Sequence, residues 1–249
     1  MNGLDLGLLT VAATGAGAVN AVVGSGSLIT FPALVAMGYP PILATVSNNV
    51  GLVPGMGSAV YGYRRELAGQ GGLLLRLVVA AAGGALIGSL LLLVLPSAWF
   101  RTVVPVLIGL ACVLVLVQPL LARRPATGRR HGGAGLWIGV FLTGIYGGYF
   151  GAAQGVVLIG LLGALTTGHL QRLNAVKNAL ALTVNLVAAV VFVSVTTVDW
   201  EVAMVIAAGS TVGGLLGSRY GRLLPPAALR GVIAAVGLLA MADLIAGSR

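Results

Sequence analysis

Apolar residues dominate the chain from end to end and are interrupted only by short polar segments. Runs of about 20 apolar residues, the length that crosses the hydrocarbon core of a bilayer as an α-helix, recur throughout. These runs cover residues 4–38, 42–62, 73–95, 103–121, 135–168, 178–197, 201–218 and 228–246. They are apolar on every face, which favours helices over the alternating strands of a membrane barrel. The pattern therefore predicts an all-α polytopic membrane protein.

Two of these runs, 4–38 and 135–168, are too long for one crossing and are broken by glycine-rich segments. The first break covers residues 24–27, and the second covers residues 147–155. Glycine permits turns and close backbone approach. Each long run is therefore expected to form a hairpin, either re-entrant or built from two short helices.

The two halves of the chain match each other when one is shifted by 129 residues. The matching pairs are Gly15 and Gly144, Gly26 and Gly155, Asn49 and Asn178, Gly84 and Gly213, Gly88 and Gly217, Leu95 and Leu224, Pro96 and Pro225, and Arg101 and Arg230. The polar segment RRPATGRRHGG lies between the halves. We therefore expect a duplication, with a first transmembrane repeat at 1–122, a linker at 123–134 and a second transmembrane repeat at 135–249.

The composition supports a membrane protein and excludes a nucleic-acid-binding one. Hydrophobic residues make up 58% of the 249 positions and charged residues only 8%, whereas a soluble globule carries roughly 25% charged residues. The formal net charge is +9, but the basic residues lie singly or in pairs between apolar runs. This placement is typical of arginines that mark the cytoplasmic side of a membrane. The lipid bilayer is the expected partner, and association of several copies is left open.

The arginines also choose between two topologies. If both long runs cross once, eight basic residues lie inside and six outside. If both runs turn back and the N-terminus is outside, twelve lie inside and only Arg101 and Arg249 outside. The positive-inside rule prefers the second arrangement. Each half is then a glycine-broken hairpin plus three transmembrane helices, so the repeats are inverted, the linker is cytoplasmic and the location is the inner (plasma) membrane.

Candidate binding residues lie in the two breaks and in the polar segments that follow them. Half-helix ends and exposed N–H groups at such breaks bind anions in inverted-repeat transporters. Intramembrane polar side chains normally face a cavity. The predicted substrate site comprises Gly24, Ser25, Gly26, Ser27, Asn48, Asn49, Gln154, Gly155, Asn174, Lys177 and Asn178.

Lys177 is the only lysine, and two interpretations of it are open. Its ammonium group either provides the fixed charge that attracts an anion or extends to the cytoplasmic surface. Catalytic chemistry has little support, because there are two isolated histidines, five acidic residues and no hydrolase or phosphate-binding motif. We therefore expect no enzyme, metal or cofactor.

Several segments resemble the sulfite exporter TauE/SafE family when taken in order. In the first half they are Leu28–Leu34 and Ala44–Asn48. In the second half they are Asn174–Asn178, Asn185 to Phe192, Asp199–Trp200, Gly209 to Gly217, and Leu224–Pro225 followed by Leu229–Arg230. The resemblance covers essentially the whole chain. The second break, with Ala152 and Ala153, has fewer glycines than is usual in that family.

The resemblance implies a secondary transporter that moves small sulfur-containing anions, such as sulfite or organosulfonates, with proton coupling. A passive anion channel is the alternative, and the sequence does not decide between them. A structural membrane protein without transport is a third reading, in which Lys177 and Asn178 would face lipid headgroups.

Overall fold

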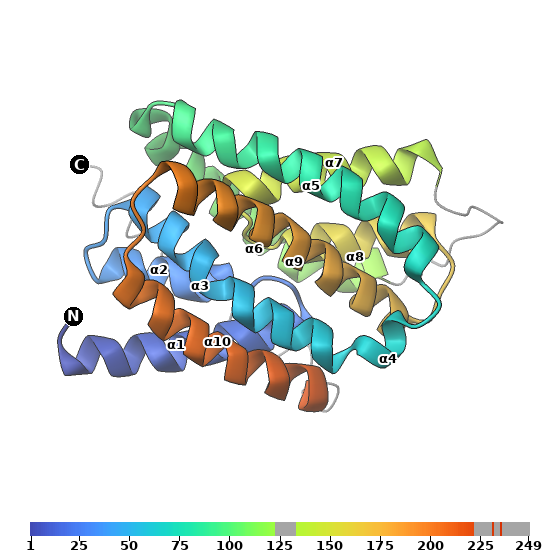
Figure 1. Cartoon of the computed structure of the whole chain (residues 1–249), viewed down its shortest axis with the longest axis horizontal. Helices are drawn as coiled ribbons and strands as arrows, with labels where there is room; N and C mark the ends of the chain where they lie inside the picture. The colour runs from blue at the N-terminus through green and yellow to red at the C-terminus, as the bar shows by residue number, and fades with distance from the viewer. Residues whose placement is uncertain (123–132, 222–230, 232–234, 236–249) are drawn as a thin grey trace.

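The structure, a computed structural model, describes residues 1–122, 133–221, 231 and 235, and ten helices make up nearly all of this part (Figure 1). In chain order they are α1 (Gly3–Val22), α2 (Ser27–Ala36), α3 (Pro41–Gly62), α4 (Arg64–Leu67), α5 (Gly71–Val94), α6 (Ser97–Ala122), α7 (Ala134–Tyr149), α8 (Gln154–Leu165), α9 (Leu170–Val195) and α10 (Trp200–Tyr220). Strands are absent from these ranges. The all-helical prediction is confirmed.

Four of the helices, α1, α5, α9 and α10, are long and apolar enough to cross a bilayer. Their outward faces carry large exposed apolar side chains, including Leu4, Leu75, Val190 and Met204. In water these would form aggregation-prone patches, whereas in a bilayer they contact lipid. The described part is therefore that of a multi-pass membrane protein.

Each of the two long apolar runs forms a pair of helices, as expected. Helix α2 packs back on α1, and α8 packs back on α7. The pairs are uneven: α1 has 20 residues and α2 has 10, while α7 has 16 and α8 has 12. With a rise of 1.5 Å per residue, α1 is about 30 Å long and reaches deep into the bundle.

The helix directions follow from close contacts between named residues. Gly213 and Gly217 of α10 pack on Thr14 and Ala18 of α1, so α1 and α10 are parallel. In α5, Gly84 and Gly88 pack on Phe141 and Ile145 of α7, so these two helices are also parallel. Figure 1 shows the two pairs along opposite edges of the bundle.

Helices α3 and α9 lie between these two pairs and are antiparallel to each other. The Asn49 amide of α3 bonds to Asn185 of α9, while near the other end Asn174 bonds to the hydroxyl of Tyr63 just beyond α3. Helix α3 also packs on α10 in parallel, with Gly51 at Ile206 and Gly55 at Ser210. Thus α1, α3 and α10 run one way, and α7, α9 and α5 run the other.

Glycine makes the parallel contacts possible. A Cβ atom built on Gly88 would overlap the carbonyl oxygen of Ile145, and one on Gly213 would overlap that of Thr14. The backbones therefore approach as closely as in the small-residue interfaces of other membrane helices. The 129-residue shift matches Gly84 with Gly213 and Gly88 with Gly217. In both halves these glycines form a close parallel helix contact.

Some predicted boundaries need correction. Helix α9 begins at Leu170 rather than at residue 178, because the polar segment before Asn178 continues the helix instead of preceding it. The last predicted linker residue, Ala134, is the first residue of α7. The rest of the linker up to residue 132 and nearly all of the predicted span 228–246 lie outside the described residues.

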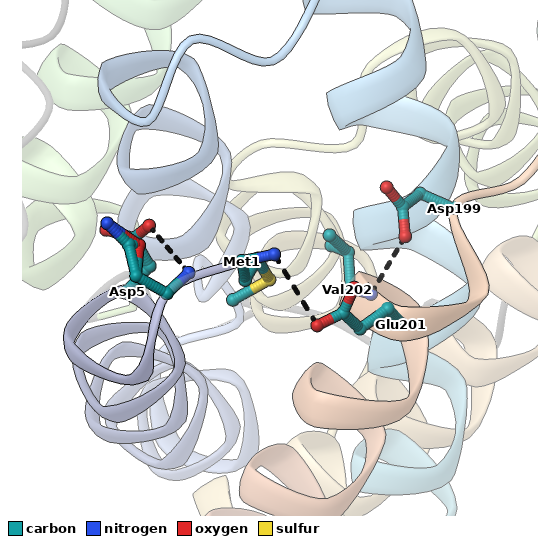
Figure 2. A network of polar contacts seen from close by, with 6 residues as sticks. Met1, Asp5, Asp199, Glu201 and Val202 are labelled. Carbon is teal, nitrogen blue, oxygen red and sulfur yellow. Dashed lines mark hydrogen bonds and ion pairs between the residues drawn. The ribbon is translucent and has the colours of Figure 1, made fainter.

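Acidic groups gather at the end of the bundle where α1 and α10 begin (Figure 2). The Met1 amino group lies 3.7 Å from Glu201, and Asp199 caps α10 by accepting a 3.1 Å hydrogen bond from the Val202 amide. The pKa of Tyr39, in the α2–α3 loop, is raised mainly by burial. The nearby carboxylates of Asp199, Glu201 and Asp5 raise it further. By contrast Arg64 and Arg65 follow the far end of α3, and Arg219 lies in the last turn of α10. Opposite charges thus mark the two ends of the bundle.

We predict that Gly88→Ala destabilises the protein by about 1–3 kcal/mol, the usual effect of overpacking, because the new methyl group must displace the α7 backbone. The measurement is thermal unfolding in detergent. Gly57→Ala in α3 is the control, since nothing lies within 4 Å of a Cβ atom at that position. Equal melting temperatures for the two variants would contradict the close packing of α5 on α7.

Candidate functional site

The two helix breaks meet in the interior of the bundle. The Gly155 amide donates a 3.1 Å hydrogen bond to the Gly24 carbonyl. A Cβ atom on either glycine would lie 2.5 Å from the Cα atom of the other. At these two glycines the hairpins touch through main chain, and a side chain at either position would push them apart.

In the first break, a glycine in the left-handed conformation follows α1, and an asparagine of α1 bonds to the residue that precedes α2. Gly24 has φ +85°, and the amides of Val23 and Gly24 both donate to the carbonyl of Val19. The Asn20 side-chain oxygen then accepts a 2.6 Å hydrogen bond from the amide of Gly26, the residue before α2. Ser25 is buried and its hydroxyl has no partner among the described residues.

The second break repeats this pattern. Gly151 has φ +76°, and the amides of Phe150 and Gly151 both donate to the carbonyl of Tyr146. The Tyr146 hydroxyl in turn donates to the carbonyl of Ala152. Ala153 also has a positive φ, 57°, which costs an alanine about 1–2 kcal/mol. This strained residue is the N-cap of α8, which begins at Gln154.

The two breaks correspond with a shift of 127 residues, so the predicted single shift of 129 is wrong here. Gly24 and Gly151 occupy the same place in the two turns. Likewise Gly17 packs on Ser210 while Gly144 packs on Ala81. Helix α8 is two residues longer than α2, and this restores the 129-residue shift at α3 and α9. With the 127-residue shift Gly26 corresponds to Ala153, since each residue precedes the second helix of its hairpin, and not to Gly155 as predicted.

A small cavity lies beside the meeting point of the breaks. Its lining residues are Asn20, Gly24, Met56, Ala59, Gly151, Gln154, Asn178 and Ala181, contributed by both breaks and by α3 and α9. The cavity volume is about 10 Å³, enough for about one water molecule. The bundle is therefore closed around this point.

The cavity is lined by amide groups that lack partners. Gln154 is 2% exposed, and neither its amide nitrogen nor its oxygen has a hydrogen-bond partner among the described residues. The side chain fills the space left by the missing Cβ of Gly147. The Asn20 amide nitrogen is likewise buried without a partner. Because buried polar groups are normally paired, these atoms are candidates for contact with a bound polar molecule.

Three side chains of α9 hold the broken end of α1. The Lys177 ammonium group donates to the carbonyls of Asn20 (3.2 Å) and Ala21 (3.4 Å). Asn178 donates to the Ala21 carbonyl at 3.0 Å, and Asn174 reaches it at 3.3 Å. A cation near the carbonyl end of a helix also interacts favourably with the helix dipole.

The burial of Lys177 excludes the interpretation in which it extends to the surface, but it does not by itself place the side chain at an anion site. The side chain is 0% exposed, and Asn178 is also buried, so neither reaches the surface or faces lipid headgroups. Lys177 is not among the residues that line the cavity, but its ammonium group bonds to Asn20, which is. The side-chain nitrogen of Lys177 is therefore one residue away from the cavity.

The remaining predicted residues divide into two groups. Gly26 and Gly155 shape the turns, while Ser27 begins α2 and is half-buried. Asn48 and Asn49 are buried in α3 but are not among the cavity-lining residues. Asn49 instead donates a 2.9 Å hydrogen bond to Asn185.

The sequence analysis missed five contributors to this region, of which Ala59 and Ala181 are small apolar residues of the cavity lining. Asn20 lines the cavity and holds the first turn, Met56 lines the cavity, and Tyr63 bonds to Asn174. An amide in the last turn of an intramembrane helix was a usable signal for Asn20. No comparable signal marks Met56, which is one apolar residue among many.

Metal binding finds no support in the described part of the chain, where no three His, Cys, Asp or Glu side chains form a group able to hold an ion. Cys112, the single cysteine of the sequence, is buried.

We predict that Lys177→Met lowers the free energy of unfolding by about 1–3 kcal/mol, because it removes the side-chain donor to the Asn20 carbonyl and one of the three donors to the Ala21 carbonyl. Thermal unfolding in detergent measures the effect. Arg172→Met is the matched control, since it removes a charge from the same helix at an exposed position. The capping role of Lys177 is refuted if the two variants melt together.

The comparisons with known proteins agree with this architecture. The sequence profile of the family described as Sulfite exporter TauE/SafE matches residues 9–244. The chain is 30% identical over 224 residues to the Probable membrane transporter protein YfcA of Escherichia coli (strain K12), covering 87% of this chain and 80% of that protein. No solved structure gives a significant match.

Two further relatives carry similar names. The Probable membrane transporter protein ORF9 of Sinorhizobium sp is 30% identical, covering 86% of this chain and 82% of that protein. A Probable membrane transporter protein of Haemophilus influenzae is 29% identical over 203 residues, covering 81% and 79%. Family and relatives are transporters and not enzymes, and the multi-pass helical bundle fits them. The chain belongs to the sulfite exporter TauE/SafE family of membrane transporters.

Proposed function

We propose that the chain is a secondary transporter for small sulfur-containing anions such as sulfite or organosulfonates, built from two inverted repeats around the cavity at the breaks. The observation that carries the proposal is the pair of buried amide nitrogens of Asn20 and Gln154, which have no partner among the described residues and are contributed by different hairpins to one small cavity. Side-chain amide N–H groups donate to anion oxygens without adding charge.

Helix directions support the inverted repeats. Helices α1, α3 and α5 correspond in chain order to α7, α9 and α10, and each member of a pair runs opposite to the other. The packing corresponds as well, because α1 lies on α10 as α7 lies on α5. In this proposal the first repeat covers residues 1–122, and the second begins with α7 at Ala134 after a linker at 123–133.

The electrostatics favour an anion as the substrate. In its protonated form the buried side chain of Lys177 places a positive charge one residue from the cavity, and in a medium of low dielectric constant its field is weakly screened. Among the described residues, no acidic side chain lines the cavity. The family description names sulfite, a compact oxyanion that such donors suit.

The small size of the cavity favours a transporter over a passive channel. A channel keeps a polar path open at both ends, whereas a transporter must close at least one. With about 10 Å³ of space, the cavity has no room for an oxyanion until the hairpins separate. Sulfite flux into proteoliposomes that responds to an imposed pH gradient supports proton coupling; gradient-independent flux supports the channel.

We predict that Gln154→Leu weakens sulfite binding roughly tenfold or more, because it removes a donor to a charged ligand. Binding by purified protein and uptake into proteoliposomes measure the effect. Gln171→Leu is the control, because the substitution is the same but residue 171 is not among those that line the cavity. Unchanged binding and uptake by Gln154→Leu would remove the cavity as the substrate site.

For the membrane orientation, we place the loop at Thr197 outside the cell and the loop at Thr167, like the linker, in the cytoplasm of the plasma membrane. A membrane-impermeant thiol reagent added to intact cells should label Thr197→Cys but not Thr167→Cys. Both side chains are exposed, and the native Cys112 is buried, so background labelling is low. The reverse labelling pattern is expected if each long apolar run crosses once.

A further inference from the structure

A second cavity, of about 690 Å³, lies at the end of the bundle where α3 and α10 finish. Its lining residues are Tyr61, Gly62, Arg64, Arg65, Glu66, Leu215, Ser218 and Arg219. None of them lines the cavity at the helix breaks. The two cavities also differ in character, since this one is large and strongly basic.

The lining of this cavity contains three guanidinium groups and only one carboxylate, that of Glu66. In the described part of the chain, no carboxylate lies within salt-bridge distance of Arg64, Arg65 or Arg219. The Arg64 guanidinium lies 4.3 Å from the centre of the Tyr61 ring and donates one 3.0 Å hydrogen bond to the Tyr61 carbonyl. That contact fixes its position and leaves its other N–H groups available.

An exposed apolar stripe on α10 leads to the arginines. It contains Met204, Ala208, Val212 and Leu216, spaced four residues apart, and Arg219 continues it one turn later. The stripe faces outward from the bundle and therefore contacts acyl chains in a membrane. Tyr61 and Tyr220 are exposed at its end, as aromatic residues are at the bilayer interface.

We propose that this cavity binds the phosphate headgroup of an anionic phospholipid whose acyl chains lie along the α10 stripe. Guanidinium groups bind phosphate through paired hydrogen bonds, and basic pockets between membrane helices bind anionic headgroups. A free oxyanion would use the arginines but not the stripe, and it would fill little of the volume. The lipid site depends only on the chain being embedded in a membrane, not on the transported substrate.

The test compares thermal unfolding of the purified full chain with added phosphatidylglycerol or phosphatidylcholine. Phosphatidylglycerol should raise the melting temperature of the wild type and phosphatidylcholine should not. The double variant Arg65→Gln/Arg219→Gln should need roughly thirtyfold more phosphatidylglycerol for the same shift, because the loss of each arginine weakens binding to an anionic headgroup about fivefold. The control is Arg76→Gln/Arg172→Gln, which removes the same charge from exposed positions outside this cavity.

Three outcomes overturn the proposal: an unchanged phosphatidylglycerol response in the Arg65/Arg219 variant, an equal response to phosphatidylcholine, or the same stabilisation by sodium phosphate at equal concentration. The last outcome would indicate a site for free anions. The Gln154→Leu variant separates this proposal from the transport site, because it should keep the full lipid response whatever its sulfite binding.

Discussion

A helix that ends inside a membrane must find partners for its last carbonyl groups, and this requirement organises the bundle. Water cannot supply the missing hydrogen bonds in the hydrocarbon region. At the end of α1, side chains of α9 supply them: Lys177 and Asn178 both donate to the carbonyl of Ala21. The polar segment of α9 is therefore required for the break itself, apart from any contact with substrate.

The same requirement explains why glycine and asparagine gather where they do. A left-handed glycine turns the chain at each break, and the backbone amides fold back onto the preceding helix. The hairpins can then meet only if Gly24 and Gly155 have no side chains. Close parallel packing of α1 on α10 and of α7 on α5 holds the hairpins at that position.

Much of this arrangement could be predicted from the sequence. Apolar length predicts the helices, and the glycine-rich interruptions at 24–27 and 147–155 predict the breaks, because hydrophobic length and glycine are local properties. The 127-residue register of the breaks could not be predicted. Glycine occurs at both 15 and 17 and at both 24 and 26, so two shifts that differ by two residues match almost equally well.

For Lys177, the sequence predicts a lysine inside the membrane but not the groups to which it bonds. Its acceptors are main-chain carbonyls, which every residue carries, so no pattern of side chains identifies them. Likewise Asn48 and Asn49 are polar in the expected segment, yet which of them would face a cavity depends on the rotation of α3 relative to α9. Periodicity within one helix does not fix that angle.

The different lengths of α2 and α8 have an energetic consequence. Perfectly matched hairpins would give the two opposite openings of the bundle equal free energies, by symmetry. Here one break is held by a lysine and two asparagines, whereas the position matching Lys177 across the repeats is Asn48. With α8 two residues longer than α2 as well, the two openings of an alternating-access carrier built on this fold would differ in free energy. That difference would set which opening is more populated at rest, whereas the direction of net transport would still follow the gradients.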